Sequence, residues 1–404
     1  MDIFVGRQPV FTKARKTFGY ELLFREGFRN MFPGIDGDTA TSKLLSNTFF
    51  SMGFDRITGN RPGLINFTKE LITAKIPLVF PKNRIIIEIL ENIEPDSDII
   101  EAVREFREKG YKIALDDFVF HEKYESLIAL SHIIKFDIRS TPLDTIEPLV
   151  RDIFKTHRIK LLAEKVETHE EFGKAVEMGF SLFQGYFFAK PEVLSAKAIP
   201  SNQLTLIELV SEVSGRDTDI EKLSRIIRAD VSLTYKLLKF INSAYFKRVY
   251  EIDTVKDAIA YLGLDEMKKF INVAAAAGMS EGKPDELMRV SLIRARMCEL
   301  FGLNFDTGFS PDELFTMGLF SLMDAMLDRK MEAVLPEISF SPRIKKGLLG
   351  QDRVFTAILD EVKCFETGDW TECFMSEEKI ESFERQQLPG FYLDAVAMAD
   401  SFFL

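Results

Sequence analysis

Polar residues follow short apolar runs at nearly regular intervals in the first half of this 404-residue chain. Successive members lie 22, 28, 19, 29 and 20 residues apart, and they are Asn66, Glu88, Asp116, Lys135, Glu164 and Gln184. A short apolar run of this kind is typical of a strand buried on both faces of a parallel sheet. Because each interval has about the length of one strand and one helix, the spacing predicts a series of strand–helix units.

The expected elements fill these intervals. A pair of strands is predicted over residues 5–24, around a polar turn at 12–16. Further strands are predicted at 64–67, 84–90, 113–117, 133–137, 161–167 and 183–188, and helices at 39–52, 98–109, 127–130, 144–157 and 169–178. Asp144 is the expected N-cap of the fourth of these helices. In a parallel barrel the strands end at one rim, so the polar residues are expected to share one pocket.

Oxygen donors dominate this predicted pocket, and they are Glu21, Asn66, Glu88, Asp116, Asp117 and Glu164. No histidine or cysteine joins them, which favours Mg²⁺ or Mn²⁺ over zinc. Two such ions would offset the repulsion between the acids and activate a water for in-line attack on a phosphodiester. Lys135 would orient that water or stabilise charge, and Arg25 would hold a phosphate oxygen. The alternative is a set of separate core ion pairs at the strand ends.

Composition narrows the classes of partner. The net charge of −11 argues against binding to a nucleic-acid polymer or an anionic membrane, but one small anionic ligand remains compatible with it. No stretch approaches 18 uncharged apolar residues, so membrane insertion is not expected. The three cysteines occur late and lack the spacing of metal ligands. They are interpreted as reduced thiols, and a cytoplasmic location is expected.

Eight segments of the first half resemble the EAL family of cyclic di-GMP phosphodiesterases. They are 8–10 (Gln-Pro-Val), 21–25 (Glu-Leu-Leu-Phe-Arg), 65–68 (Ile-Asn-Phe-Thr), 88–91 (Glu-Ile-Leu-Glu), 115–118 (Leu-Asp-Asp-Phe), 134–137 (Ile-Lys-Phe-Asp), 163–168 (Ala-Glu-Lys-Val-Glu-Thr) and 184–191 (Gln-Gly-Tyr-Phe-Phe-Ala-Lys-Pro). The resemblance covers roughly residues 1–192. It implies a TIM-like (β/α)8 barrel with one reversed strand.

The resemblance also implies roles for individual residues. Lys135 and Gln184 would act on the attacking water, and Glu164 would be a metal ligand or a partner of the base. Gln8 and Arg25 would hold the dinucleotide. The implied metal ligands are Glu21, Asn66, Glu88, Asp116 and Asp117.

Two stretches depart from the family pattern. The family usually continues from Asp-Asp-Phe as Gly-Thr-Gly-Tyr-Ser-Ser, whereas residues 119–126 here read Val-Phe-His-Glu-Lys-Tyr-Glu-Ser. Glu91 is implied to anchor that loop, and it is kept while the glycines are lost. Lys165 replaces a further family glycine. The metal ligands are thus present and their support is altered.

The second half has a helical pattern, and a domain boundary is predicted near residue 199, giving domains at 1–199 and 200–404. Segments 227–233, 240–246 and 258–263 resemble the HDOD family, an all-α domain related to HD phosphohydrolases. An HD hydrolase needs clustered His and Asp ligands. All four histidines, His121, His132, His157 and His169, fall in the first half. The helical domain is therefore expected to bind a protein partner without metal-dependent hydrolysis.

Three functions remain open from the sequence. The chain is a bacterial signalling enzyme that hydrolyses cyclic di-GMP to the linear dinucleotide, a receptor that binds cyclic di-GMP without cutting it, or an interaction scaffold. The complete ligand set favours the enzyme, and the altered loop at 119–126 favours the receptor. A homodimer also remains open, because the changed loop removes the usual argument for the family's barrel dimer.

Overall fold

The computed structural model describes residues 3–26, 54–156, 158–190, 255–368 and 387–403, with single residues between 206 and 241. The helix predicted at 39–52 lies outside these residues, as do most of segments 227–233 and 240–246. The chain divides into two compact units. The first comprises Met1–Phe188 with Phe365–Thr371, and the second comprises Ala189–Cys364 with Glu372–Leu404.

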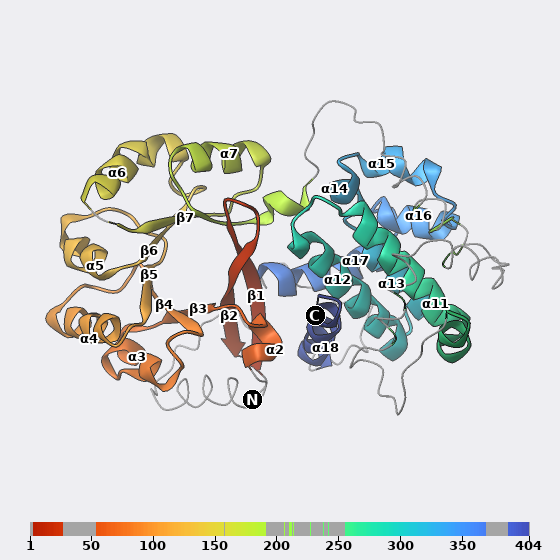
Figure 1. Cartoon of the computed structure of the whole chain (residues 1–404), viewed down its shortest axis with the longest axis horizontal. Coiled ribbons are helices and arrows are strands. Elements are labelled where there is room, and N and C mark those ends of the chain that lie inside the picture. The colour runs from red at the N-terminus through yellow and green to blue at the C-terminus, as the bar shows by residue number, and fades with distance from the viewer. Residues whose placement is uncertain are drawn as a thin grey trace. The chain divides into compact units, whose positions relative to one another are not determined.

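The first unit contains a closed barrel of eight strands (Figure 1). In chain order these are β1 (Ile3–Thr12), β2 (Thr17–Glu26), β3 (Gly63–Phe67), β4 (Ile85–Ile89), β5 (Lys112–Leu115), β6 (Ile133–Asp137), β7 (Lys160–Glu164) and β8 (Leu182–Gln184). β1 pairs antiparallel with both β2 and β8, and all other neighbouring strands pair in parallel. The prediction of a barrel with one reversed strand is confirmed, and β1 is that strand.

Helices connect the parallel strands and lie outside the barrel (Figure 1). They are α2 (Phe54–Thr58), α3 (Lys69–Thr73), α4 (Ser97–Glu108), α5 (Glu125–Leu130), α6 (Leu143–Thr156) and α7 (His169–Glu177), with 3-10 turns η2 (Ile76–Val79), η3 (Glu122–Tyr124) and η4 (Tyr186–Ala189). The helix α6 begins at Leu143, so Asp144 lies in its first turn and is not its N-cap as expected. The four helices predicted within the described residues all form.

Two strands end earlier than expected. The strand β7 stops at Glu164 because Lys165 adopts a left-handed backbone conformation with φ 55°. The strand β8 stops at Gln184, since Gly185 has φ 141° and turns the chain into η4. Hydrogen bonds from Val166 N to Gln184 O (2.9 Å) and from Phe187 N to Val166 O (3.1 Å) hold the two strand ends together. Both departures lie at the rim that carries the polar residues.

The barrel is filled by one layer of inward-facing apolar side chains. This layer contains Val10, Leu64, Ile86, Ala114, Ile133, Leu162 and Leu182, all of them buried. Successive side chains of a strand point to opposite faces, so residues two positions along a strand point the same way. The next inward-facing residues toward the carboxyl ends of the parallel strands are the polar residues described below.

The second unit is helical in its described part. Its helices are α11 (Val255–Met279), α12 (Asp285–Asn304), α13 (Pro311–Phe320), α14 (Met323–Leu327), α15 (Met331–Val334), α16 (Pro342–Leu348), α17 (Arg353–Thr367) and α18 (Leu388–Ser401), with one 3-10 turn, η5 (Leu335–Glu337). The last three residues of α17 belong to the first unit. The helix α11 is interrupted at Gly263, which has non-helical backbone angles. The prediction of a helical second half is confirmed there.

None of the described helices is both long and apolar enough to cross a membrane. Cys298 is a buried free thiol. Cys364 is disulfide-bonded, so the expectation of three reduced thiols is wrong for this residue. The spacing of cysteines along a chain does not determine which sulfur atoms the fold brings together.

Candidate functional site

The predicted site residues form a polar layer directly above the apolar layer of the barrel. Six of them lie two positions beyond a residue of that apolar layer, as Asn66 does from Leu64 and Glu88 from Ile86. The strand register places Asn66 beside Glu88. The same offset applies to Asp116, Lys135, Glu164 and Gln184. In β1, which runs the other way, Gln8 precedes Val10 by two residues and lies opposite Glu21. The structure therefore brings these strand-end side chains together at one rim of the barrel.

Lys135 lies at the centre of this layer and its side chain is fully buried. Its Nζ atom contacts four carboxylates from four other strands or strand ends. The distances are 2.7 Å to Asp116 Oδ1, 2.8 Å to Glu88 Oε1, 2.9 Å to Glu164 Oε1 and 3.3 Å to Glu21 Oε2. The site is therefore one connected cluster and not a set of separate core ion pairs.

The amide side chains extend the cluster on the side of β1 and β2. The Nε2 atom of Gln184 donates to Glu21 Oε2 at 2.8 Å and to Gln8 Oε1 at 2.5 Å. The Nδ2 atom of Asn66 donates to Glu21 Oε1 at 3.3 Å. Glu21 thus accepts hydrogen bonds on both oxygens while it contacts Lys135. These contacts hold its carboxylate in place within the cluster.

One ammonium group cannot balance four carboxylates in a buried cluster, and the proton affinities of the site reflect this excess. Burial raises the pKa of Glu88 well above its usual range, and the nearby Glu21 and Asp116 add to that rise against the opposing effect of Lys135. Burial also raises the pKa of Glu164 well above its usual range. Burial opposes the charge on Lys135, but the carboxylates, Glu164 first, raise its pKa well above the usual value. The cluster therefore binds either protons or additional cations.

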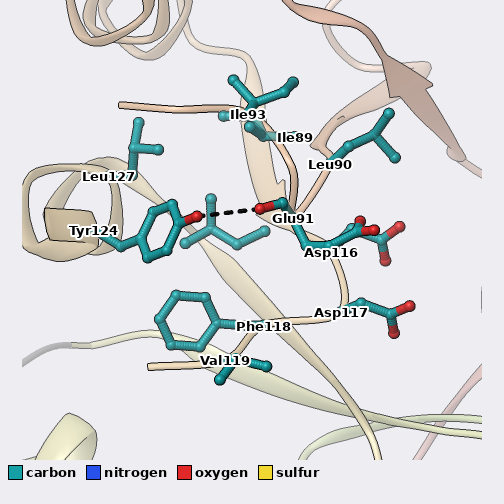
Figure 2. Close-up of a pocket in the computed structure, with 11 residues that line it drawn as sticks. Ile89, Leu90, Glu91, Ile93, Asp116, Asp117, Phe118, Val119, Tyr124 and Leu127 are labelled. Atoms are coloured by element: carbon teal, nitrogen blue, oxygen red, sulfur yellow. Dashed lines mark hydrogen bonds between the residues drawn. The ribbon is translucent and has the colours of Figure 1, made fainter. Parts of the chain in front are cut away.

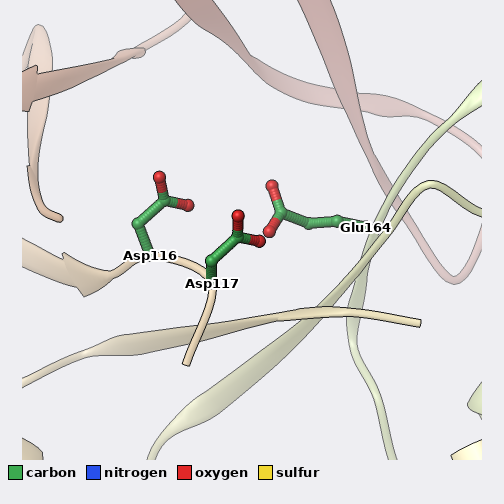
Figure 3. A group of neighbouring side chains, drawn as sticks. All are labelled: Asp116, Asp117 and Glu164. Atoms are coloured by element: carbon green, nitrogen blue, oxygen red, sulfur yellow. The ribbon is translucent and has the colours of Figure 1, made fainter. Parts of the chain in front are cut away.

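Several oxygens of the cluster are suited to a cation. Asn66 Oδ1 and Glu88 Oε2 are buried and accept no hydrogen bond in the described structure. Figure 3 shows the carboxylates of Asp116 and Asp117, from the end of β5, pointing toward that of Glu164 from β7. One oxygen of each lies within 4.8 Å of the others. Unsatisfied buried acceptors and grouped carboxylates are the environment that Mg²⁺ or Mn²⁺ takes in proteins, so the residues fit divalent ions.

Two predicted residues are only partly placed. Arg25 lies in β2 opposite Phe4, and its side chain is outside the described part of the structure. The carboxylate of Glu91 is exposed and has no hydrogen bond or ion pair among the described residues. The main-chain oxygen of Glu91 accepts from Tyr124 Oη at 3.1 Å, as Figure 2 shows. The implied roles of Arg25 and of the Glu91 carboxylate stay predictions.

Asp137 and Lys165 also lie at the rim, and the sequence reasoning gave Asp137 no role. Asp137 is buried, and its carboxylate accepts from Lys165 Nζ at 2.6 Å and from Ser140 Oγ at 2.8 Å. The hydrogen bonds that the Asp137 carboxylate accepts, that of Lys165 first, lower the pKa of Asp137, although its burial opposes them. Asp137 lies two residues beyond Lys135 on β6, and this spacing predicts that the two side chains point to the same side of the strand. Lys165 keeps the left-handed backbone that a glycine would adopt easily, with φ 55°.

Known proteins resemble both units in sequence. The family model of the EAL domain matches residues 56–191, and that of the HDOD domain matches residues 199–327. Cyclic di-GMP phosphodiesterase CdgJ of Vibrio cholerae is 36% identical over 369 residues, which are 91% of this chain and 85% of that protein. Uncharacterized protein YuxH of Bacillus subtilis is 32% identical over 408 residues, and the alignment covers 98% of each of the two chains.

A solved structure of a standalone EAL protein from Vibrio cholerae, in its c-di-GMP bound form, is also similar. It is 23% identical, with a TM-score of 0.36, and the match covers 47% of this chain and 92% of that one. The family is shown by the two domain matches and by CdgJ, which aligns along most of both chains. The chain belongs to the family of EAL–HDOD proteins that are related to cyclic di-GMP phosphodiesterases.

Proposed function

We propose that this protein hydrolyses cyclic di-GMP to the linear dinucleotide with two divalent ions, Mg²⁺ or Mn²⁺. The observation that carries the proposal is the cluster of four carboxylates around the buried Lys135, with acceptors of Asn66 and Glu88 left without hydrogen bonds. The relationship to a phosphodiesterase that aligns with 91% of the chain supports the choice of substrate.

The ligands divide into two groups by their positions. Glu21, Asn66 and Glu88 lie on adjacent strands, and Asp116, Asp117 and Glu164 form the group that Figure 3 shows. In this proposal each group contributes to holding one ion, and Asp116 stands between the two. Divalent ions bound there would neutralise the phosphate charge and acidify a water.

The chain's own groups would then orient the reactants. Lys135 would hold the attacking water and stabilise the negative charge that develops on the phosphorus oxygens. Glu164 would accept a proton from that water, since its carboxylate lies beside those of Asp116 and Asp117. Gln184 would keep Glu21 in place through its 2.8 Å hydrogen bond. Gln8 and Arg25 would hold the dinucleotide.

Turnover of cyclic di-GMP by the purified full chain tests this function. The protein would be incubated with cyclic di-GMP and Mn²⁺, and the linear product separated by chromatography. Product is expected from the wild type and not from Glu21→Ala, and it should disappear when EDTA removes the ions. Absence of product from folded wild-type protein would overturn the proposed hydrolysis.

The remodelled segment 119–126 favours a second candidate, a receptor that binds cyclic di-GMP without cutting it. Two glycines of the family pattern are absent there, beside Asp117. Calorimetry on the same protein separates the two candidates. Binding without product would establish the receptor, and the absence of both binding and product would leave the interaction scaffold.

We also propose that the helical unit is an interaction module for a protein partner. It contains no histidine, and the group of acids that could hold a metal ion, among the described residues, lies in the barrel. The buried Glu299 of this unit is paired internally with Lys269 at 2.5 Å. A coupling between nucleotide binding in the barrel and partner binding by the helical unit would be tested by measuring the affinity of a captured partner with and without cyclic di-GMP. An affinity that is independent of the nucleotide would count against it.

A further inference from the structure

Two contacts hold the segment that follows Asp117 against the end of β4 and the loop after it. Tyr124 Oη donates to the main-chain oxygen of Glu91 at 3.1 Å, as the dashed line in Figure 2 marks. Beside it, Lys123 Nζ contacts Glu94 Oε1 at 2.7 Å. Both charged groups of that pair are exposed, so the pair adds little to stability. The hydrogen bond of Tyr124 is the stronger candidate for a tether.

Asp117 needs such support because of its backbone. It has φ 37°, a left-handed conformation that a residue with a side chain adopts at a cost and keeps only when its surroundings impose it. The chain is fixed on one side by Asp116 N, which donates to Ile89 O at 3.0 Å. On the other side Phe118 N donates to Lys135 O at 2.9 Å. Beyond Phe118 the described contacts to β4 and its loop come from Lys123 and Tyr124.

Packing beneath the segment is incomplete. A cavity of about 190 Å³ lies between the end of β4 and this segment, lined mostly by apolar side chains that include Ile89, Ile93 and Leu127. Figure 2 shows the carboxylates of Asp116 and Asp117 pointing away from the apolar residues of this cavity. Val119 and Phe120 remain 68% and 49% exposed. The segment therefore depends on a few contacts, among them the ring of Tyr124, whose centroid lies 6.0 Å from that of Phe118.

We infer that Tyr124 is a positioning residue for Asp117, and that it holds the segment through the main chain of Glu91 in place of the Glu91 carboxylate. The hydroxyl fixes the far end of residues 118–124, Phe118 transmits that position through its contacts with the Tyr124 and Phe136 rings, and Asp117 keeps its direction toward Glu164. The consequence for metal binding rests on the proposed function, whereas the tether itself does not.

The test compares three conservative variants of the full chain. Tyr124→Phe removes the hydroxyl and keeps the ring. Tyr111→Phe is the matched control. The Tyr111 hydroxyl donates to Phe80 O at 2.7 Å. Tyr111 lies just before β5, at the end of that strand away from Asp116. Glu91→Gln removes the charge of the carboxylate and keeps the main-chain oxygen. Hydrogen exchange of residues 118–124 and titration with Mn²⁺ by electron paramagnetic resonance are the two measurements.

Loss of one neutral hydrogen bond corresponds to about a fivefold change in an equilibrium. Tyr124→Phe is therefore expected to speed exchange in residues 118–124 about fivefold and to weaken Mn²⁺ binding by ~3- to 10-fold. Tyr111→Phe should change neither quantity, and Glu91→Gln should change both less than Tyr124→Phe does. Equal exchange in the two tyrosine variants, or a larger effect of Glu91→Gln, would overturn the inference. If the wild type binds no Mn²⁺, the proposed metal-dependent hydrolysis is wrong. The exchange measurement still decides whether Tyr124 holds the segment.

Discussion

Lys135 Nζ lies 2.8 Å from Glu88 Oε1, and both side chains are completely buried inside the barrel. A buried charge that loses its partner is strongly destabilising, and Lys135 is shared by four carboxylates. We therefore expect Lys135→Met to lower the free energy of unfolding in EDTA by about 3–5 kcal/mol. Added Mn²⁺ should restore part of the loss, because the ions replace the missing positive charge.

Urea unfolding with EDTA and with Mn²⁺ measures both quantities. Lys13→Met, which changes an exposed lysine of the β1–β2 turn, is the control and should alter stability by less than about 0.5 kcal/mol. A loss of less than 1 kcal/mol for Lys135→Met would show that the buried lysine does not balance the cluster.

Asp117→Asn is expected to separate function from stability. Burial and the neighbouring Asp116 raise the pKa of Asp117, so a neutral amide removes repulsion in the metal-free protein. Stability should stay constant or increase slightly, while Mn²⁺ binding weakens by ~10-fold or more and turnover falls with it. Thermal unfolding and Mn²⁺ titration on the same samples test the two directions. Unchanged Mn²⁺ affinity would remove Asp117 from the set of ligands.

His132 predicts a pH dependence of barrel stability. Burial, with the charges of Arg107 and Lys112, lowers its pKa, and its Nδ1 atom accepts a hydrogen bond from Ile113 N at 3.2 Å. The folded state favours the neutral ring, whereas the unfolded chain takes up a proton below its ordinary pKa of about 6.5. Stability from this group is thus present above pH 6.5 and is lost as the pH falls below it, by up to about 1 kcal/mol.

The variant His132→Asn keeps an acceptor at this position and cannot titrate. Its unfolding free energy should change less between pH 7 and pH 5 than that of the wild type, with chemical denaturation as the measurement. Parallel pH profiles for the two proteins would contradict the assignment of a neutral, hydrogen-bonded ring.

Two glycines give opposite predictions for the same substitution. Gly185 has φ 141°, and a Cβ atom there would lie 2.2 Å from Val166 O, so Gly185→Ala should destabilise the barrel by about 3 kcal/mol or more. Gly173 lies in α7, and outside its chain neighbours and the helix's own backbone no atom lies within 4 Å of such a Cβ, so Gly173→Ala should stabilise by up to about 1 kcal/mol. Thermal unfolding of both variants tests the pair. A tolerated Gly185→Ala would show that the ends of β7 and β8 are not joined as described.

The strand–helix order and the inward direction of most site residues were predictable, because each polar residue interrupts an apolar run at the same phase. Asn66 and Glu88 are examples, since period two along a strand fixes their direction once Leu64 and Ile86 are in the core. The early end of β7 was not predictable. It depends on the left-handed backbone of Lys165, a residue type that seldom adopts it.

The support of the altered segment also could not be predicted. A hydrogen bond from Tyr124 to the main chain of Glu91 joins residues 33 apart, and a main-chain acceptor leaves no mark in the sequence. The central position of Lys135 was likewise hidden, because its four contacts depend on the closure of the barrel. Residue type and phase identified the members of the site, and the fold determined which of them touch.

Hydrolysis in ¹⁸O-labelled water tests the central claim most directly. Purified protein, cyclic di-GMP and Mn²⁺ would be combined in labelled water, and the product analysed by mass spectrometry. In-line attack of water on one phosphodiester predicts a linear dinucleotide that carries one ¹⁸O atom on its terminal phosphate. Glu21→Ala should give no labelled product. Intact cyclic di-GMP after incubation with the wild type, or a linear product without label, would contradict the proposal that this barrel is a hydrolytic phosphodiesterase.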